Sequence, residues 1–507
     1  MTNTLFDALL AAGRRDLSRR FALLPDGRDY SYEAVEAVSA RFANVLTKLG
    51  LQPGDRVAVQ VEKSIEALML YLGTVRAGGV FLPLNTAYTP AEVEYFLTDA
   101  KPRVFVCDPK KRDQLAPIAE AAGATIETLG VWASEGQSAG SLSDKALAAS
   151  NRFATVERGP EDLAAILYTS GTTGRSKGAM LTHANLLSNA EVLKETWRFT
   201  EDDVLLHALP IFHTHGLFVA SNTLLVAGGA MIFLPKFDVD EVFRHLGQAT
   251  SMMGVPTFYT RLLADERLSR ETAGHIRLFT SGSAPLLAET HRAFEARTGQ
   301  RILERYGMTE TNMNTSNPYD GERRAGTVGF PLPGVSLRIA DPETGAELPV
   351  GEIGMIEVKG PNVFSGYWQM PEKTASEFRK DGFFITGDLG LIDADGYVSI
   401  VGRGKDLVIT GGFNVYPKEV ELAIDELPGV VESAVIGVPH KDFGEGVVGC
   451  VVAKEPLEEE AVIGALKDKL ARFKQPKRIV FVDELPRNTM GKVQKNILRE
   501  RFAGLLS

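Results

Sequence analysis

Apolar and polar positions along the first 110 residues change repeatedly between two spacings. Residues 32–49 and 64–76 repeat apolar side chains at the spacing of an α-helix, whereas 57–61, 80–84 and 103–107 are short, mostly apolar runs. Helical segments that alternate with such runs are typical of βαβ units around a buried parallel sheet. We therefore predict an α/β fold.

The alternation returns after residue 230 and points to a first candidate site. Strand-like runs occupy 231–234, 276–280 and 301–303, and polar, glycine-containing segments follow the last two at 281–285 and 306–310. Ligands of open α/β sheets bind at the carboxyl ends of the strands. We expect these two segments to lie beside a ligand.

Two further stretches have a distinct pattern. Residues 216–235 carry no charge and are numerous enough to span a bilayer. Gly228 and Gly229 would break a spanning helix in its middle, so we favour a buried helix followed by a buried strand at 230–234. Strand-like runs dominate 335–363 and predict a small β subdomain.

Length and cysteine content limit what this chain can be. A chain of 507 residues exceeds what one hydrophobic core supports, which predicts at least two domains. Its only cysteines, Cys107 and Cys450, lie far apart, which argues against a disulfide framework or a zinc cluster and fits a reducing cytosol. The arginine-rich segment 14–20 also contains acid, so we interpret it as part of a first helix and expect a cytoplasmic protein.

The charge of the chain is unevenly distributed. A net charge of −10 offers no general attraction to nucleic acid or to an anionic membrane, and we expect neither as a stable partner. Residues 467–501 contain eleven basic and four acidic residues. Such a segment is usually only solvated, but this one could also meet the phosphates of a ligand.

A polar loop follows the strand-like run 163–167. Residues 168–178 combine hydroxyl side chains, three glycines, one arginine and one lysine. Glycines let backbone N–H groups turn toward an anion, and hydroxyls and Lys177 add donors. A Walker A loop needs lysine directly after its last glycine, whereas Arg175 and Ser176 intervene here. By itself the segment is equally compatible with an ordinary connecting loop.

Five motifs in order resemble those of the adenylate-forming family, which includes acyl-CoA and aryl-CoA synthetases, luciferases and the adenylation domains of peptide synthetases. They are the loop 168–178 and the segments 306–311, 386–388, 402–417 and 486–495. The resemblance covers nearly the whole chain, and the order and spacing of the motifs give each of them weight.

This resemblance implies two domains and a two-step reaction. A large N-terminal domain of parallel sheets, helices and a small β subdomain would comprise residues 1–404, and a small mobile α+β domain residues 405–507, with Lys405 as the hinge. The catalytic residues implied are Lys492, Glu310 and Thr309. In the family, the lysine that matches Lys492 bridges the substrate carboxylate and the α-phosphate side of ATP.

The ligands implied by the resemblance are ATP, Mg²⁺ and coenzyme A. The residues implied for ATP or AMP are Thr169, Ser170, Gly171, Thr172, Thr173, Gly174, Lys177, Ser283, Ala284, Glu304, Tyr306, Gly307, Thr309, Asp388, Arg403 and Lys492. Glu310 and Thr173 would hold Mg²⁺, and Gly411 and Gly412 would let coenzyme A pass close to the backbone.

The acid substrate is suggested by a narrower resemblance. The segments 304–310 and 486–492 look like those of malonate–CoA ligases. A diacid brings a second carboxylate that must meet a cation, because a buried unpaired charge costs several kcal/mol. Arg305 is the first candidate to bind this carboxylate. The weaker candidates for the acid site are His207, Met308 and Arg277.

Other interpretations stay open at this point. Arg305 could line the adenine site or pair with Glu304, and His207 could be a hydrogen-bonded core residue. The acid could be methylmalonate, oxalate, a medium-chain acid or an aryl acid. A peptide-synthetase adenylation domain and a nucleotide sensor without catalytic activity are rival functions.

The expected partners are small molecules, namely malonate, ATP and coenzyme A. Related enzymes carry reversible acetylation on the lysine that matches Lys492, so a lysine acetyltransferase and deacetylase are further expected partners.

Overall fold

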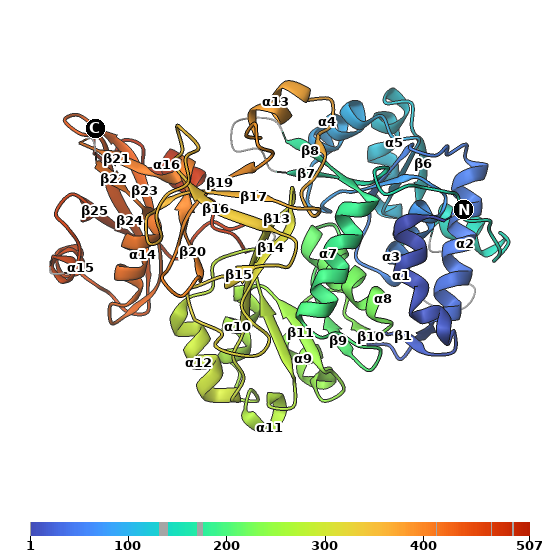
Figure 1. Cartoon of the computed structure of the whole chain (residues 1–507), viewed down its shortest axis with the longest axis horizontal. Helices are drawn as coiled ribbons and strands as arrows, with labels where there is room; N and C mark the ends of the chain where they lie inside the picture. The colour runs from blue at the N-terminus through green and yellow to red at the C-terminus, as the bar shows by residue number, and fades with distance from the viewer. Residues whose placement is uncertain are drawn as a thin grey trace.

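Two large sheets lie side by side in the N-terminal four-fifths of the chain, and two smaller sheets follow (Figure 1). These are seen in a computed structural model that describes residues 2–130, 140–169, 176–411, 413–467, 469–488 and 491–506. The predicted α/β fold is confirmed, since parallel strands joined by helices form most of both large sheets.

The first sheet has the strand order β18-β8-β7-β4-β3-β5-β6 and is parallel from β7 to β6. Its strands are β3 (Arg56–Gln60), β4 (Val80–Pro83), β5 (Val104–Cys107), β6 (Thr125–Thr128), β7 (Leu163–Thr169), β8 (Lys177–Thr182) and β18 (Gly366–Tyr367).

The second sheet has the order β15-β14-β13-β12-β11-β9-β10-β1-β2 and is parallel from β13 to β1. Its strands are β1 (Arg20–Leu23), β2 (Asp29–Ser31), β9 (Val204–His207), β10 (Ala230–Phe233), β11 (Ser251–Gly254), β12 (Leu278–Ser281), β13 (Leu303–Met308), β14 (Asn312–Ser316) and β15 (Phe330–Pro331).

Helices cover both faces of each large sheet. One hydrophobic core runs through the facing sides of the two sheets and the helices between them, which are α1 (Thr4–Ala11), α2 (Tyr32–Lys48), α3 (Ile65–Arg76), α7 (His183–Thr196), the π-helix η3 (His215–Asn222) and α8 (Thr223–Ala227). The outer faces carry α4 (Pro90–Ala100) and α5 (Arg112–Ala121) on the first sheet, and α9 (Val239–Leu246), α10 (Pro256–Leu263), α11 (Arg270–Ala273) and α12 (Ala288–Thr298) on the second. Two short helices, α6 (Ser141–Leu147) and α13 (Pro371–Ser376), complete this part of the chain.

The five elements predicted between residues 32 and 107 match the structure to within one or two residues. The uncharged stretch 216–235 is a buried π-helix and α8 followed by β10, as predicted. No helix in the described part of the chain is both long and apolar enough to cross a bilayer. The first helix was predicted wrongly, because α1 ends at Ala11 and the arginine-rich segment 14–20 continues into a 3₁₀ turn and β1.

The predicted small β subdomain is an antiparallel sheet of four strands. It contains β16 (Ser336–Ala340), β17 (Gly354–Lys359), β19 (Phe384–Ile392) and β20 (Val398–Arg403) in the order β16-β17-β19-β20. The fourth sheet begins a few residues later, with the order β22-β21-β24-β23 and β25 beside β24. Its elements are β21 (Val408–Thr410), β22 (Phe413–Val415), α14 (Pro417–Asp425), β23 (Val430–His440), β24 (Gly444–Ala453), α15 (Glu459–Leu466), β25 (Arg478–Phe481) and α16 (Lys495–Phe502).

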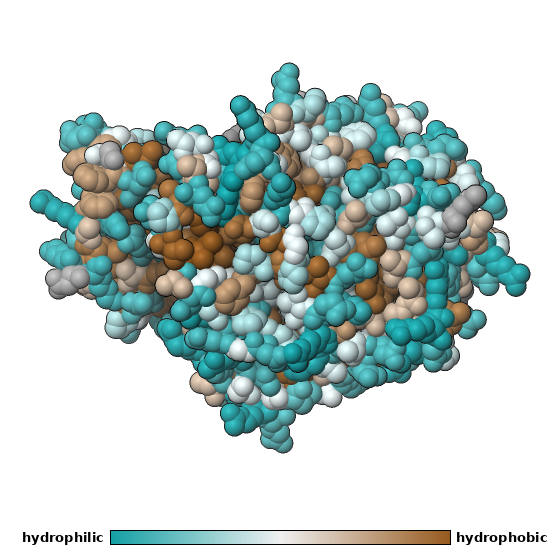
Figure 2. All heavy atoms as spheres, in the orientation of Figure 1, coloured by the Kyte–Doolittle hydropathy of each residue, from teal (hydrophilic) through white to brown (hydrophobic). Residues whose placement is uncertain are grey.

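The fourth sheet and its helices leave much apolar surface exposed. In Figure 2 tan and brown residues are scattered over this part of the molecule, and the largest brown group lies where it adjoins the four-stranded sheet. Seven of the ten exposed large hydrophobic side chains among the described residues belong to it: Ile409, Phe413, Leu422, Val431, Phe443, Phe481 and Ile497. Exposed apolar residues at this density indicate a surface that meets another surface at some stage.

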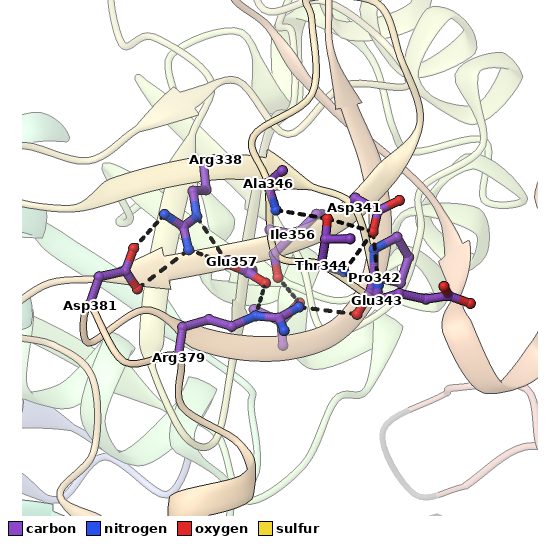
Figure 3. A network of polar contacts seen from close by, with 11 residues as sticks. Arg338, Asp341, Pro342, Glu343, Thr344, Ala346, Ile356, Glu357, Arg379 and Asp381 are labelled. Atoms are coloured by element: carbon purple, nitrogen blue, oxygen red, sulfur yellow. Dashed lines mark hydrogen bonds and ion pairs between the residues drawn. The ribbon is translucent and has the colours of Figure 1, made fainter.

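A buried ionic network holds the four-stranded sheet together (Figure 3). The fully buried Glu357 on β17 accepts hydrogen bonds from Arg338 Nη2 at 2.8 Å and from Arg379 Nε at 2.7 Å. Arg338 also donates to Asp381 at 2.6 Å. Glu357 therefore links β17 to β16 through Arg338 and to the segment before β19 through Arg379.

We predict that Glu357→Ala lowers the free energy of unfolding by about 3 kcal/mol, because it leaves two partly buried guanidinium groups without their shared carboxylate. Scanning calorimetry should show this as a lower midpoint. Asp320→Ala is the control, because Asp320 pairs with Arg198 on the surface, where both side chains are more than 60% exposed, and such pairs contribute about 0–1 kcal/mol. Equal midpoints for the two variants would contradict the prediction.

Candidate functional site

The carboxyl ends of the parallel strands of the second sheet meet at one edge. β9, β11 and β12 end there, and Ser281 at the end of β12 pairs in register with Glu304 on β13. The loop after β12 and the turn after β13 are the two glycine-containing segments that the sequence singled out. They are neighbours in space, as predicted from the parallel strand order.

A buried carboxylate lies at this edge. Asp388 on β19 accepts a hydrogen bond from the Tyr306 hydroxyl at 2.6 Å, and Arg403 Nε of β20 lies 3.3 Å from its other oxygen. Burial, followed by the charge of Asp388, raises the pKa of Tyr306 well above its ordinary value. Tyr306 is therefore a neutral donor, and the three side chains form one group drawn from two sheets.

A second buried carboxylate occupies the turn between β13 and β14. Glu310 accepts a hydrogen bond from the Tyr367 hydroxyl at 3.0 Å. Burial raises the pKa of Glu310. The ammonium of Lys177 lies 4.2 Å from the centre of the Tyr367 ring and 3.7 Å from Glu377. Lys177 therefore lies near Glu310, with the Tyr367 ring adjacent to both.

The turn itself depends on glycine. A Cβ atom at Gly307 would come within 1.9 Å of the Asn312 carbonyl oxygen, a distance that no real contact allows. Asn312 has a left-handed φ of 49°, which asparagine tolerates better than most residues. Gly307 therefore acts through the backbone: it lets the chain reverse tightly enough to bring Glu310 to the edge.

Lys492 reaches the same edge from the far end of the chain. Burial, with the neighbouring positive charge of Arg403, lowers the pKa of Lys492 to about 8, and the charges of Asp388 and Asp406 oppose this shift. The preceding residue, Gly491, packs against Thr257 of α10, since a Cβ atom there would lie 3.3 Å from the Thr257 side chain. The fourth sheet therefore places an ammonium group beside the Asp388 carboxylate.

Arg305 is a buried cation, and two of its three guanidinium nitrogens are unpartnered within the part of the chain that the structure describes. The residue is 3% exposed, and its Nε and Nη2 atoms have no hydrogen-bond partner among the described residues. A Cβ atom at Gly282 would lie 2.2 Å from Nη1, so the guanidinium lies directly against the loop after β12. Leaving a buried charge unpaired is unfavourable by several kcal/mol, which indicates an anionic ligand at this position.

Two neutral histidines neighbour this guanidinium. Burial, and then the charge of Arg305, lowers the pKa of His213 to about 4 and that of His215 well below its ordinary value. His215 Nδ1 lies 3.2 Å from the hydroxyl of Ser283, whose φ of 70° turns the loop back on itself. The charge of Lys492 also lowers the pKa of His213, so the region near Arg305 contains cations and neutral polar groups.

The structure separates Arg305 from Glu304. Neighbouring residues on a strand point to opposite faces, so Glu304 lies on the face of Tyr306 and accepts a hydrogen bond from the backbone of Gly326 at 3.3 Å. Burial raises the pKa of Glu304 to about 8. The alternative in which Arg305 pairs with Glu304 is therefore wrong.

Two candidates for the acid site are placed elsewhere. Arg277 precedes β12, at the amino edge of the sheet, where it pairs with Asp203 at 2.7 Å and donates to the Trp197 carbonyl. Both ring nitrogens of His207 are engaged, since Nδ1 lies 3.0 Å from Lys63 Nζ and Nε2 lies 2.9 Å from the Gly216 carbonyl oxygen. The prediction that Arg277 binds the acid is wrong, and His207 is the hydrogen-bonded core residue of the alternative interpretation.

The remaining predicted residues fall into two groups. Thr169 and Lys177 pair across the ends of β7 and β8, Met308 ends β13, Ala284 and Thr309 lie in the loops at the edge, and Lys405 lies in the turn between β20 and β21. Six predicted residues lie outside the described residues: Ser170, Gly171, Thr172, Thr173, Gly174 and Gly412.

Gly282 and Tyr367 are parts of the site that the sequence interpretation missed. Gly282 stands within the segment 281–285 that the pattern singled out, but its role depends on how close Arg305 lies. Tyr367 is 57 residues from Glu310, and no local pattern connects the two.

Comparisons with known proteins show which family this chain belongs to. The family model described as AMP-binding enzyme matches residues 11–368, and the model of the AMP-binding enzyme C-terminal domain matches 419–492. The malonate–CoA ligase of Arabidopsis thaliana is 35% identical over 532 residues, which cover 95% of this chain and 86% of that protein.

Solved structures are similar along the whole chain. The ATP-bound crystal structure of MatB from Rhodopseudomonas palustris has a TM-score of 0.97 and 64% sequence identity, with full coverage of both chains. The apo structure of the same protein, with the same identity and coverage, has a TM-score of 0.86. The arrangement described above is therefore more similar to the ATP-bound structure than to the apo structure.

Proposed function

The chain belongs to the AMP-binding enzyme family, and we propose that it joins malonate to coenzyme A at the expense of ATP, through a malonyl-AMP intermediate. The observation that carries the choice of acid is the buried guanidinium of Arg305, whose Nε and Nη2 lack partners among the described residues.

Malonate carries a second negative charge, which could pair with the buried guanidinium of Arg305. One of its carboxylates must stay free to react, and the other can pair with Arg305. A fatty or aryl acid would bury an apolar group against a bare guanidinium, which costs several kcal/mol. Longer diacids and methylmalonate share the second carboxylate and are the runner-up substrates.

In the first step, an oxygen of the reacting carboxylate attacks the α-phosphorus of ATP, and pyrophosphate leaves with the electron pair of the broken P–O bond. Asp388 and Arg403 would bind the ribose, with the Tyr306 ring against adenine. Lys492 would bring its charge between the two anions, which must approach each other before either is neutralised.

The donor set fits a magnesium ion. Glu310 offers a buried carboxylate oxygen beside Lys177, and the phosphates of ATP would add further hard oxygen ligands. Within the described ranges, no cluster of three or more metal-binding side chains competes for this role. The ion would neutralise phosphate charge during the displacement. Thr173, the second proposed ligand, lies outside the described residues.

The second step needs a different surface at the same edge. The thiol sulfur of coenzyme A attacks the carbonyl carbon of malonyl-AMP, AMP leaves, and the thiol proton passes to solvent. We propose that the chain has two domains, 1–404 and 405–507, with Lys405 as the hinge. Rotation of the second domain about this hinge would remove Lys492 from the site and admit the thiol. The exposed apolar side chains of the second domain support such an exchange of surfaces.

Gly411 fits a close approach of the cosubstrate. Its φ is 57°, and a Cβ atom there would lie 3.2 Å from the Phe443 ring. Because the segment 402–417 resembles the family motif beside which coenzyme A passes, we propose that Gly411 and Gly412 lie along its path after the rotation.

Acetylation of Lys492 would erase the charge on which the first step depends. We propose that a lysine acetyltransferase and a deacetylase control the enzyme at this residue. Intact mass and activity measured before and after treatment with an acetyltransferase test this, and modification without loss of activity would refute it. The cytoplasmic location stays a prediction.

We predict that malonate gives the highest kcat/KM for AMP formation in a panel with methylmalonate, succinate, acetate, octanoate and coumarate. Arg305→Leu should lower kcat/KM for malonate by about 10²-fold or more, as expected when one member of a buried charge pair is removed. Activity toward acetate should change much less.

Arg277→Lys is the matched control, because lysine can keep the pair with Asp203 at the opposite edge of the sheet. It should leave the order of acids unchanged. Faster turnover of octanoate or coumarate than of malonate by the unaltered enzyme would refute the diacid assignment and leave the family assignment intact.

We also predict that the first step slows as pH rises. Burial lowers the pKa of Lys492 to about 8, and the charged form is the active one, so kcat/KM for malonate-dependent pyrophosphate exchange should fall above about pH 8. Lys492→Arg stays charged and should remove this decline while lowering the rate. A decline of the same shape in both proteins would assign it to another group.

A further inference from the structure

Lys492 lies in a pair of short segments, residues 486–488 and 491–494, which bond to each other and which we call the hairpin. Within it, Asn488 N donates to the Lys492 carbonyl at 2.9 Å, and Lys492 N donates to the Asn488 side chain at 3.0 Å. Gln494 N donates to the Pro486 carbonyl at 2.7 Å. These bonds close the hairpin on itself but do not attach it to the sheet from which it projects.

Val493 packs on the apolar cluster of this sheet, and Arg487 adds a polar attachment. Its Nη1 donates to the Gly491 carbonyl at 2.6 Å, and its Nη2 forms an ion pair with Glu432 on β23. About a quarter to a third of each of these two side chains is exposed. One guanidinium thus joins the Glu432 carboxylate to the backbone carbonyl of the residue before Lys492.

The peptide between Gly491 and Lys492 has a neighbour on two sides. Arg487 donates to the Gly491 carbonyl, and Thr257 lies so near that a Cβ atom at Gly491 would come within 3.3 Å of its side chain. Gly491 has a φ of 73°, a conformation that glycine adopts without strain. A change in the position of the Gly491 carbonyl would therefore rotate the peptide from which the Lys492 side chain begins.

A second ion pair marks the other end of the hairpin. Lys495, the first residue of α16, lies 2.5 Å from Glu421 of α14. Glu421 also accepts a hydrogen bond from the backbone of Val435 at 2.9 Å. This pair fixes the start of α16 and has no contact with the Gly491 carbonyl, so it does not duplicate the function of Arg487.

We propose that Arg487, paired with Glu432, is a positioning residue for Lys492 in the adenylation step. It acts by holding the Gly491 carbonyl, and it touches neither the acid nor the nucleotide. The proposal rests on the proposed function, in which Lys492 serves only the first step. Since the hairpin leaves the site before the thiol attacks, Arg487 should matter for adenylation and not for thioester formation.

The test measures the two half-reactions separately. Arg487→Ala should lower kcat/KM for malonate-dependent pyrophosphate exchange by about 10–10²-fold, the loss expected when a reacting group shifts by a fraction of an ångström to an ångström. Conversion of supplied malonyl-AMP to malonyl-CoA should stay within about twofold of the unaltered enzyme.

Two conservative variants keep the test informative if alanine disturbs folding. Arg487→Lys can reach either Glu432 or the Gly491 carbonyl but lacks the fork that holds both, so it should recover part of the adenylation rate. Glu432→Gln keeps an acceptor without its charge and should cause a smaller, equally selective loss. Arg478→Ala is the matched control, because it removes an arginine–glutamate pair of the same domain, with Glu459, at a distance from Lys492.

The possible outcomes are distinct. A selective loss of adenylation in both Arg487 variants, absent in Arg478→Ala, supports the proposal. Equal losses in the two half-reactions, or no loss, overturn it, because a merely structural ion pair does not distinguish the steps. Lys492→Ala is the reference: if it leaves adenylation intact, the proposed function of Lys492 fails and the role of Arg487 fails with it, whereas a loss in Lys492→Ala without a loss in Arg487→Ala overturns the role of Arg487 alone.

Discussion

Ligand binding by this protein depends on positive charge that the fold buries at the carboxyl edge of the second large sheet. Arg305 is buried without a carboxylate beside its Nε and Nη2 atoms among the described residues, and burial together with Arg403 depresses the pKa of Lys492. Cations held in this way are unfavourable for the free protein and become favourable when anions arrive. The affinity of the site for two anionic reactants therefore comes from charge that the fold itself does not neutralise.

The remainder of the molecule places these charges. Parallel strands bring the loop after β12 and the turn after β13 to one edge, and the left-handed φ of Ser283 keeps that loop compact against Arg305. The four-stranded sheet contributes Asp388 and Arg403 from paired positions, and its own strands are joined through the fully buried Glu357. Stability in this subdomain and geometry at the site thus share one set of strands.

Lys492 is the exception to this rigid placement. It arrives on a hairpin of the C-terminal part of the chain, which holds seven of the ten exposed large hydrophobic side chains among the described residues. In the proposed mechanism this domain presents two surfaces in turn and cannot bury both at once, which would account for the exposure. The same mechanism requires Lys492 to be placed accurately each time the domain closes, and we propose that the link from Glu432 through Arg487 to the Gly491 carbonyl does this.

The sequence by itself determined the alternation of strands and helices, the two glycine-containing segments at the site and the family motifs, because each depends on residues that are close together in the chain. It ranked Arg305 above Arg277 and His207 but could not exclude either of them, since Arg305 lies within a strand of the second sheet, Arg277 precedes one and His207 ends one. Tertiary structure decided between them: Arg277 lies at the amino edge with Asp203, His207 is enclosed by Lys63 and Gly216, and Arg305 faces the loop that Gly282 keeps open. The physical reason is that strand direction, register and burial decide which charge remains unpaired, and these are properties of segments brought together only by folding.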